Sequence, residues 1–371
     1  MAERVHPGPY AGERSIKRNK VIAIVIVWAF IGVLITIYDH FFVHSILSSG
    51  PSSDYSFLSS LILNVGIGVA AALLGATFIV YVVHEKFRNK PYWQSIALVA
   101  GSFIVLSITL TALVSAIMLL LTNDSTPSWE ALKLFIADSS NLKNILVWLV
   151  VVALTQVTLQ VHDKFGQGVL WSLIVGKYQV PKEELRIFMF VDLNASTQLA
   201  EKLGNDLYHR FLRDFYADIT NPIIYNRGEI YQYVGDEVVI SWKPLGKGFD
   251  NSCLQCYFEM LKVMAERNDY YMTTYKYAPS FKVGLHHGHV IAGEIGIIKR
   301  DVTFSGDVLN TASRIQGKCK EYGVTILVSN ALLDLLPESD LIQRIPIGNV
   351  ELRGREHSIL LSTLKPVNRL D

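Results

Sequence analysis

Long apolar runs dominate the first half of the chain, whereas the second half alternates short apolar runs with polar segments. An α-helix needs about 20 apolar residues to cross the hydrocarbon core of a bilayer. Four runs reach that length, at residues 21–43, 57–83, 95–121 and 142–161. They predict an all-α membrane domain of four transmembrane helices over residues 21–161, preceded by a basic N-terminus over residues 1–20.

A shorter patterned segment follows at residues 162–182. Its apolar residues recur at helix-like spacing, and glycines interrupt the stripe. The stripe consists of Phe165, Val169, Leu170, Leu173 and Ile174. We expect a bent or short linker helix that either pairs with a copy of itself or packs on its own domain. Residues 183–371 then form a soluble domain large enough for its own core.

Charged residues separate the two halves further. Asp, Glu, Lys and Arg occupy 11 of the 141 positions from 21 to 161 and 49 of the 210 positions from 162 to 371. The first proportion is low, as in a membrane domain, and the second is ordinary for a soluble domain. Together they exclude a wholly soluble enzyme, a disordered chain and a fibrous repeat. A net charge of +1 gives no electrostatic basis for nucleic-acid binding, and three cysteines are typical of a reduced cytosolic setting.

Basic residues predict the orientation of the helices. Five Lys or Arg residues lie in the N-terminus and three in the loop at 84–94, while the loop at 44–56 has none and the loop at 122–141 has one. The positive-inside rule therefore places the N-terminus and the soluble domain in the cytoplasm, in a multi-pass protein of the cell (inner or plasma) membrane.

The apolar half is expected to act mainly as an anchor. Asn64, Gly66, Gly68 and Gly75 of the second span can form a helix–helix face. The spans carry no buried charge of the kind that marks an ion or proton pathway, which argues against a transporter.

The soluble domain opens with a buried-strand pattern at residues 186–191 that ends in Asp192. A hydroxyl-rich turn and a helical pattern follow it. An acid at the end of a strand, beside the start of a helix, suits a site for a metal ion and a triphosphate, with the backbone N–H groups of residues 194–197 facing the phosphates. Taken alone, Ser196 or Thr197 is more often a helix N-cap.

A second acid lies in a predicted hairpin at residues 228–242. Gly235 and Asp236 form the tight turn between its two strands. Two strand-end aspartates, Asp192 and Asp236, could hold a pair of divalent ions between them, although Gly-Asp is by itself a common turn dipeptide.

A third patterned region, residues 281–315, contains a glycine-rich strand pattern followed by a predicted helix. Asn310 and Arg314 are four residues apart, so they share one face of that helix. Asp307 is positioned to cap it.

The four segments FVDLNAST, YQYVGDEVV, GLHHGHVIAGEIG and GDVLNTASRI occur in this order along the soluble domain. Together they resemble the catalytic domain of class III nucleotidyl (adenylate/guanylate) cyclases, and the apolar half resembles the membrane anchor of some bacterial members. The resemblance implies an α+β catalytic domain with a ferredoxin-like βαββαβ core. It also implies catalysis with two Mg²⁺ or Mn²⁺ ions at the interface of a homodimer.

The resemblance assigns roles to particular residues. Asp192 and Asp236 match the metal ligands, joined by the carbonyl group of Leu193. Asn310 and Arg314 match the pair that orients the ribose and stabilises the transition state. In the family this pair comes from the subunit opposite the metal aspartates. Further substrate-binding residues are expected at Asn194, Ala195, Ser196, Thr197, Gln232, Thr303 and Arg353, the last of which matches a basic residue that contacts the triphosphate.

Two positions set the choice of base in this family. Gln232 stands where adenylate cyclases usually have Lys and guanylate cyclases usually have Glu. Its amide offers both a donor and an acceptor, so it suits either base. Thr303, at the second position, can accept a hydrogen bond from the adenine 6-amino group. The two residues together favour ATP and leave GTP possible.

We therefore expect a membrane-bound adenylate cyclase, a lyase that converts ATP to 3′,5′-cyclic AMP and pyrophosphate. Its partners are the substrate, a second copy of the chain and the lipid bilayer. The alternatives are a guanylate or dual-specificity cyclase and a catalytically silent membrane receptor that binds nucleotide. The complete set of metal-binding and Asn/Arg residues argues against the receptor.

Overall fold

The structure, a computed structural model, describes residues 11–46, 57–83, 91–122, 139–165, 175–246, 248–298, 300–354 and 357–367. The chain divides into two compact units, Met1–Phe165 and Gly166–Asp371. Phe165, the first residue of the expected linker stripe, ends the last helix of the first unit. The rest of that stripe lies outside the described residues.

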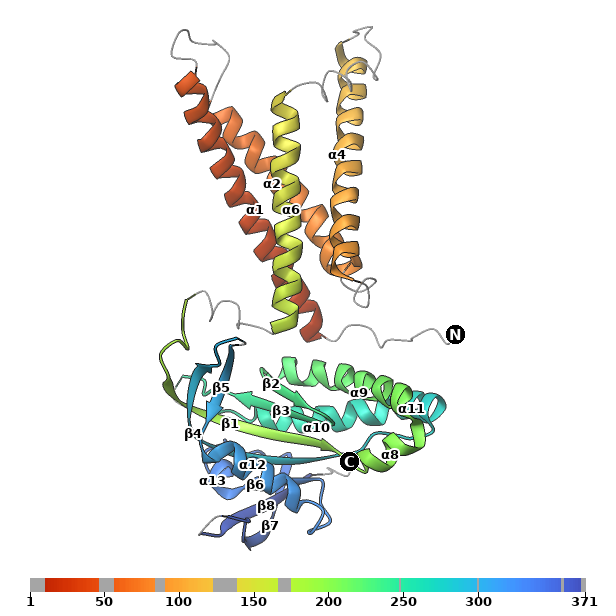
Figure 1. Cartoon of the computed structure of the whole chain (residues 1–371), viewed down its shortest axis with the longest axis vertical. Coiled ribbons are helices and arrows are strands. Elements are labelled where there is room, and N and C mark those ends of the chain that lie inside the picture. The colour runs from red at the N-terminus through yellow and green to blue at the C-terminus, as the bar shows by residue number, and fades with distance from the viewer. Residues whose placement is uncertain are drawn as a thin grey trace. The chain divides into compact units, whose positions relative to one another are not determined.

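Helices make up the described part of the N-terminal unit (Figure 1). They are α1 (Ala11–Ile46), α2 (Phe57–Phe78) with the following π-helix η1 (Ile79–Val83), α4 (Tyr92–Thr122) and α6 (Ser139–Phe165). Among the described residues, two stretches are long and apolar enough to cross a membrane, Lys17–Phe41 and Asn64–Val83. Shorter apolar stretches lie in α4 and α6, at Trp93–Leu106 and Ile145–Val161. The four expected helices are thus present, and a crossing by all four stays a prediction.

The expected helix–helix face on α2 packs against α1. A Cβ on Gly68 would lie 3.1 Å from the carbonyl oxygen of Trp28, and a Cβ on Gly75 would lie 3.5 Å from the Trp28 ring. The Asn64 side chain donates a hydrogen bond to a threonine hydroxyl of α1 at 3.0 Å. Gly66 has no heavy atom within 4 Å of its Cβ position, so it lies outside this face.

An ion pair links two helices of the N-terminal unit. Asp39 of α1 lies inside the first apolar stretch, with 21% of its side chain exposed, and forms an ion pair with Lys143 of α6. Because each charge neutralises the other, the pair joins two helices.

The C-terminal unit is an α+β domain. Its described strands form one eight-stranded sheet in the order β2-β3-β1-β4-β6-β8-β7, and β5 pairs with β4. The strands are β1 (Lys182–Leu193), β2 (Glu229–Val234), β3 (Glu237–Trp242), β4 (Phe281–Ile295), β5 (Asp301–Ser305), β6 (Ile326–Ser329), β7 (Ile342–Val350) and β8 (Ile359–Pro366). The first four strands and the helices between them follow the expected βαββαβ order, and β6 extends the sheet parallel to β4.

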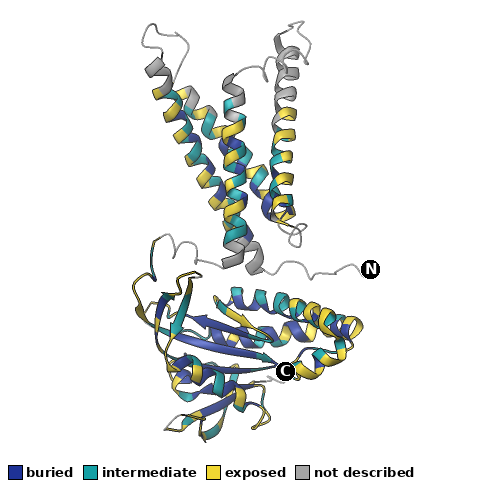
Figure 2. Cartoon of the chain, in the orientation of Figure 1, coloured by how far each residue is buried: buried dark blue, intermediate teal, exposed yellow. Residues whose placement is uncertain are grey.

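Helices cover both faces of this sheet (Figures 1 and 2). α9 (Asn205–Tyr225) and α10 (Ser252–Glu266) lie on one face and α12 (Asp307–Lys318) on the other, with the shorter α8 (Ser196–Leu203), α11 (Asn268–Tyr275) and α13 (Asn330–Leu333) beside them. Because both faces of β1 are covered, its residues 187–191 are all buried, which explains their unbroken apolar run. Phe188 and Phe190 pack with Ala312 under α12.

A missing side chain lets α12 lie directly on β4. A Cβ on Gly284 would lie 2.3 Å from the backbone nitrogen of Gln316 and 2.5 Å from the carbonyl oxygen of Ala312. Any larger residue would displace α12, and with it Asn310 and Arg314, from the sheet.

The expected cap of α12 is corrected by the structure. Gly306, with a φ of +153°, is the N-cap, and Asp307 is the first helical residue. The Asp307 carboxylate instead accepts a hydrogen bond from the Thr311 hydroxyl at 3.2 Å, within the first turn.

Candidate active site

Asp192 and Asp236 come together at one end of the sheet. Asp192 lies near the end of β1, and Asp236 lies in the tight turn between β2 and β3, as the sequence predicts. The register of β1 and β3 places Glu237, the residue after Asp236, directly opposite Asp192. Strand pairing therefore brings the two aspartates, 44 positions apart in the sequence, into one site.

Asp192 and Glu237 in this site have raised pKa values. Burial and then the charge of Asp236 raise the pKa of Asp192 to about 6, and a hydrogen bond from Gln316 offsets only part of this. Burial and the charges of both aspartates raise the pKa of Glu237 to about 7. A group of carboxylates that repel one another in a half-buried site favours the binding of a cation.

The residues fit a divalent ion bound together with a phosphate ligand. In the described ranges, no three His, Cys, Asp or Glu side chains converge in a metal-binding arrangement. Mg²⁺ usually takes one or two carboxylates from a protein and completes its coordination with water and substrate phosphates. Asp192 and Asp236 supply the two carboxylates, and Leu193, which ends β1 beside them, has the backbone carbonyl expected as a further ligand.

A tyrosine of α9 holds the turn that carries Asp236. The Tyr216 hydroxyl donates to the carbonyl oxygen of Gly235 at 2.9 Å, and its ring lies 4.6 Å from that of Tyr233. Burial and then the charge of Asp236 raise the pKa of Tyr216, so the hydroxyl stays protonated and remains a donor.

The turn after β1 leads into α8 without a side-chain cap. Ala195 is the N-cap, with a φ of 55°, and no side chain accepts a hydrogen bond from the first turn, so the expectation of a Ser196 or Thr197 cap is wrong. The backbone N–H of Asn194 donates to the carbonyl oxygen of Ser280 at 2.8 Å and is therefore already used. The N–H groups of residues 195–197, at the positive end of the α8 dipole, suit phosphate oxygens.

The two sides of α12 have different surroundings. Gln316 donates from Nε2 to Oδ2 of Asp192 in the same chain at 3.2 Å. Arg314 precedes Gln316 by two residues, which is roughly 200° around a helix of 3.6 residues per turn, and Asn310 shares the Arg314 side. Asn310 is exposed. The expected Asn/Arg pair thus lies on a side of α12 directed away from Asp192 of its own chain.

A second basic residue lies near that pair. A Cβ on Gly354 would lie 3.5 Å from Nη2 of Arg314, and Arg353 directly precedes Gly354. The loop after β7 therefore brings the backbone next to Arg353, which is exposed, close to Arg314 in space.

The two positions expected to select the base, Gln232 and Thr303, are joined through their neighbours. Gln232 follows Tyr231, the extra residue of a bulge in β2, and Thr303 precedes Phe304 in β5. The Tyr231 and Phe304 rings lie 4.9 Å apart, and the Phe304 N–H donates to the Tyr231 hydroxyl at 3.5 Å. The Thr303 hydroxyl donates to the carbonyl oxygen of Gly293 at 3.4 Å, which leaves its oxygen able to accept.

Gln316 and Tyr216 belong to the site but were not predicted from the sequence. The spacing of Gln316 from Asn310 and Arg314 is enough to assign it to the other side of the helix. That Asp192 lies on this other side follows only from the packing of α12 on β4. Tyr216 is one of many aromatic residues, and nothing in its local pattern marks it.

Residues 178–363 match the family described as the adenylate and guanylate cyclase catalytic domain. Adenylate cyclase 2 of Rhizobium meliloti (strain 1021) is 32% identical over 206 residues, which cover 56% of this chain and 57% of that protein. The adenylate cyclase of Anabaena cylindrica is 29% identical over 188 residues, covering 48% and 36% respectively. The chain therefore spans about half, or less, of these relatives.

A solved structure of a bacterial light-regulated adenylyl cyclase has the same fold. It superimposes with a TM-score of 0.53 at 20% sequence identity, covering 62% of this chain and 67% of that one.

Proposed function

Because the chain belongs to the family of adenylate and guanylate cyclase catalytic domains, we propose that it converts ATP to 3′,5′-cyclic AMP and pyrophosphate. The observation that carries this proposal is the pairing of Asp192 with Asp236 at the site expected for catalytic metal ions, where burial and the charge of Asp236 raise the pKa of Asp192. The names of its relatives, adenylate cyclases in both cases, support the adenylate form of the activity.

Asp192, Asp236 and the Leu193 carbonyl would hold two Mg²⁺ or Mn²⁺ ions. When bound, these ions supply Lewis acidity that lowers the pKa of the ribose 3′-hydroxyl and neutralises charge on the phosphates. The chain's own groups bind and orient the substrate: the N–H groups at the start of α8 and the guanidinium of Arg353 contact the triphosphate. Arg314 donates to the phosphate oxygens as their charge develops.

The reaction is an in-line displacement at the α-phosphate. The 3′-oxygen forms a bond to the α-phosphorus, the bond from that phosphorus to the β-phosphate oxygen breaks, and the hydroxyl proton leaves to solvent. Positioning and electrostatic stabilisation carry most of the catalysis, as in other phosphoryl transfers.

The active site is proposed to form between two copies of the chain. Gln316 faces Asp192 of its own chain, while Asn310 and Arg314 lie on the other side of the same helix. One helix cannot direct both sides at one substrate. A homodimer resolves this, because the Asn310 and Arg314 side of each α12 then completes the site of the partner.

ATP is proposed as the preferred substrate. The Thr303 oxygen can accept a hydrogen bond from the adenine 6-amino group, and the Gln232 amide can donate to adenine N1. Because the same amide can accept from guanine N1–H, GTP is the second candidate and discrimination is expected to be incomplete.

The N-terminal unit is proposed to anchor the protein in the cell membrane through four helices, with the N-terminus and the catalytic domain in the cytoplasm. Two apolar stretches of sufficient length and two shorter ones support this, together with the distribution of Lys and Arg between the loops.

The test is cyclic nucleotide formation by the full-length chain in membranes, supplied with ATP or GTP and with Mg²⁺ or Mn²⁺. We expect cyclic AMP as the main product. Nucleotide binding without any cyclic product would instead support the silent receptor. Equal amounts of cyclic AMP and cyclic GMP would support a dual-specificity enzyme.

A mixing experiment tests the shared site. Asp192→Ala and Arg314→Ala chains, each inactive alone, should regain activity when co-expressed, because one of the two sites in a mixed dimer keeps all its residues. Co-purified mixed dimers without activity would contradict the shared site and leave the reaction itself untouched.

A further inference from the structure

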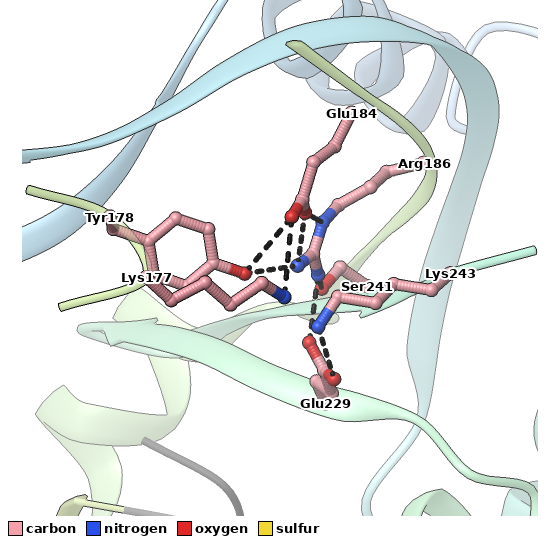
Figure 3. Close-up of polar contacts among 7 residues, drawn as sticks. All are labelled: Lys177, Tyr178, Glu184, Arg186, Glu229, Ser241 and Lys243. Atoms are coloured by element: carbon pink, nitrogen blue, oxygen red, sulfur yellow. Dashed lines mark hydrogen bonds and ion pairs between the residues drawn. The ribbon is translucent and has the colours of Figure 1, made fainter. Parts of the chain in front are cut away.

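Arg186, on β1, is a buried charge with 1% of its side chain exposed. Figure 3 shows its guanidinium between Glu184 and Glu229. Its Nε donates to Glu184 at 2.8 Å, and Nη1 donates to Glu229 at 2.8 Å. Further hydrogen bonds join the guanidinium to the Ser241 hydroxyl at 3.0 Å and the Tyr178 hydroxyl at 3.3 Å. Burial alone would raise the pKa values of both glutamates, but Arg186 outweighs it and lowers them, so both stay ionised at neutral pH.

The residues around Arg186 come from separate parts of the domain. We call this group the Arg186 cluster. It consists of Lys177, Tyr178, Glu184, Arg186, Glu229, Ser241, Lys243 and Phe304. Arg186 precedes Asp192 by six residues, roughly 20 Å along an extended strand, so the cluster does not touch the metal-binding residues.

A buried charge is not what a sheet needs for stability. Removing ions from water is costly, and apolar residues of similar volume often stabilise a core equally well. A polar network in which every group is hydrogen-bonded does, however, hold the segments that it joins in one defined arrangement. The question is therefore which segments the Arg186 cluster holds in place.

Two of these segments, β2 and β5, carry the residues proposed to select the base. The Arg186 guanidinium lies 4.3 Å from the centre of the Phe304 ring, and Phe304 contacts Tyr231 through both its ring and its N–H. Phe304 is the residue after Thr303, and Tyr231 is the residue before Gln232. The chain of contacts thus ends on the immediate neighbours of both base-selecting residues.

The segment at residues 175–181, which leads into β1, is connected to Thr303 by a second set of contacts. The Tyr178 carbonyl oxygen accepts a hydrogen bond from the Glu294 N–H at 3.0 Å. The last residue of the segment, a proline, lies 3.3 Å from the Cβ position of Gly293. Gly293 pairs with Thr303 and accepts the hydrogen bond from its hydroxyl.

We propose that Arg186 is a positioning residue for base recognition. Through Phe304 and Tyr231 it fixes the separation of Thr303 and Gln232, and thereby sets the affinity for the base and the preference between ATP and GTP. The inference rests on the proposed function, since it requires that the nucleotide base binds at Gln232 and Thr303.

The experiment compares Arg186→Met and Phe304→Leu with the wild-type full-length chain in membranes. Kinetics give KM and kcat for ATP and GTP, and equilibrium binding gives Kd for ATP, GTP and inorganic tripolyphosphate, which lacks a base. We expect KM and Kd for ATP to rise about three- to tenfold, and the ATP/GTP preference to change about threefold or more. The kcat should change less than KM, and Kd for tripolyphosphate should not change.

Arg267→Met is the matched control. Arg267 forms an ion pair with Asp218 at 3.1 Å and lies 4.0 Å from the centre of the Tyr270 ring, so it resembles Arg186 in chemistry. It joins α9 to the α10–α11 region and not to β2 or β5. Its loss should lower the folded fraction without changing KM, Kd or the ATP/GTP preference.

Tyr231→Phe is a variant that is expected to fold, because it removes only one hydroxyl and leaves every ion pair of the Arg186 cluster intact. It should shift the ATP/GTP preference in the same direction as Phe304→Leu, by a smaller factor. If Arg186→Met does not fold, Phe304→Leu and Tyr231→Phe test the inference in its place.

The outcomes separate this inference from the proposed function. Wild-type KM values and preference in Phe304→Leu and Tyr231→Phe would overturn the inference, and so would an equal loss of tripolyphosphate binding. A wild-type chain that binds ATP without forming cyclic product overturns the proposed function alone, because the Kd values of the variants still test the inference. A wild-type chain that binds no nucleotide overturns both.

Discussion

The two ends of β1 carry polar clusters with opposite electrostatics. At the N-terminal end, Arg186 lies between two glutamates and lowers the pKa values of both. At the C-terminal end, Asp192 faces Asp236, and burial together with that charge raises its pKa to about 6. Both ends are polar and at least partly buried, yet only the first is balanced by the chain's own charges.

This difference separates a group that maintains the fold from a group that binds a ligand. The Arg186 cluster is complete without any other molecule, so its role concerns the positions of the segments that it joins. The aspartate pair keeps an unbalanced negative charge, which under the proposed function a divalent cation neutralises. Burial alone does not distinguish the two cases, whereas the direction of the pKa shift does.

The largest expected effect is the loss of activity on breaking the aspartate pair. Asp236→Ala should lower cyclic AMP formation about 10³-fold or more, because it removes one of the two carboxylates proposed to hold the metal ions. Asp206→Ala, which removes an exposed acid from the first turn of α9, should retain activity. Normal turnover by Asp236→Ala would remove the basis for treating this end of β1 as a metal site.

Breaking the balanced cluster should mainly affect stability. Glu184→Ala leaves the buried Arg186 with Glu229 as its one acidic partner among the described residues, so the free energy of unfolding should fall by about 3 kcal/mol in chemical denaturation. The pKa of Glu184 is lowered from its ordinary value of 4.5, so its stabilisation is present above that pH and is lost as the pH falls through the folded-state pKa. The difference between the variant and the wild type should therefore narrow in acid.

An exposed pair provides the control for Glu184→Ala. Glu266 pairs with Lys262 at 3.9 Å on the surface of α10. Glu266→Ala should change the free energy of unfolding by about 0.5 kcal/mol or less. Equal effects of the two substitutions would mean that the Arg186 cluster contributes no more than a surface ion pair.

A smaller effect is expected where α12 contacts the aspartate pair. Gln316→Leu removes the hydrogen bond to Asp192, so the Mn²⁺ concentration needed for half-maximal activity should rise about 10- to 100-fold. Gln255→Leu, at an exposed position of α10, is the matched control. An unchanged metal requirement in Gln316→Leu would show that the orientation of Asp192 does not depend on α12.

The smallest expected effect is a gain in stability from removing the repulsion. The pKa of Asp192 rises from 3.8 to about 6 on folding, so the ionised carboxylate destabilises the folded state above pH 6, and this penalty disappears below pH 4. In the absence of divalent ions, Asp192→Asn should raise the melting temperature by about 2–4 °C at pH 8. A lower melting temperature at pH 8 would contradict the repulsion between the acids.

Local patterns were sufficient for much of the fold and for the choice of site residues. The unbroken apolar run before Asp192 predicted a strand covered on both faces, and the Gly235-Asp236 turn predicted the hairpin. The N-cap of α12 was predicted wrongly. Gly306 occupies this position with a φ of +153°, a backbone angle that residues with a capping side chain rarely adopt. The Asp39–Lys143 pair was missed because its members lie 104 positions apart.

The residue types in the chain decided which chemical groups are available: two strand-end acids, an Asn/Arg pair and an apolar half of membrane-like composition. The folded arrangement decided which of these groups face one another. Gln316 meets Asp192 across 124 positions, and Tyr231 meets Phe304 across 73. Such contacts depend on the register of the sheet and the rotation of α12 on Gly284, and these are set by packing summed over the whole core.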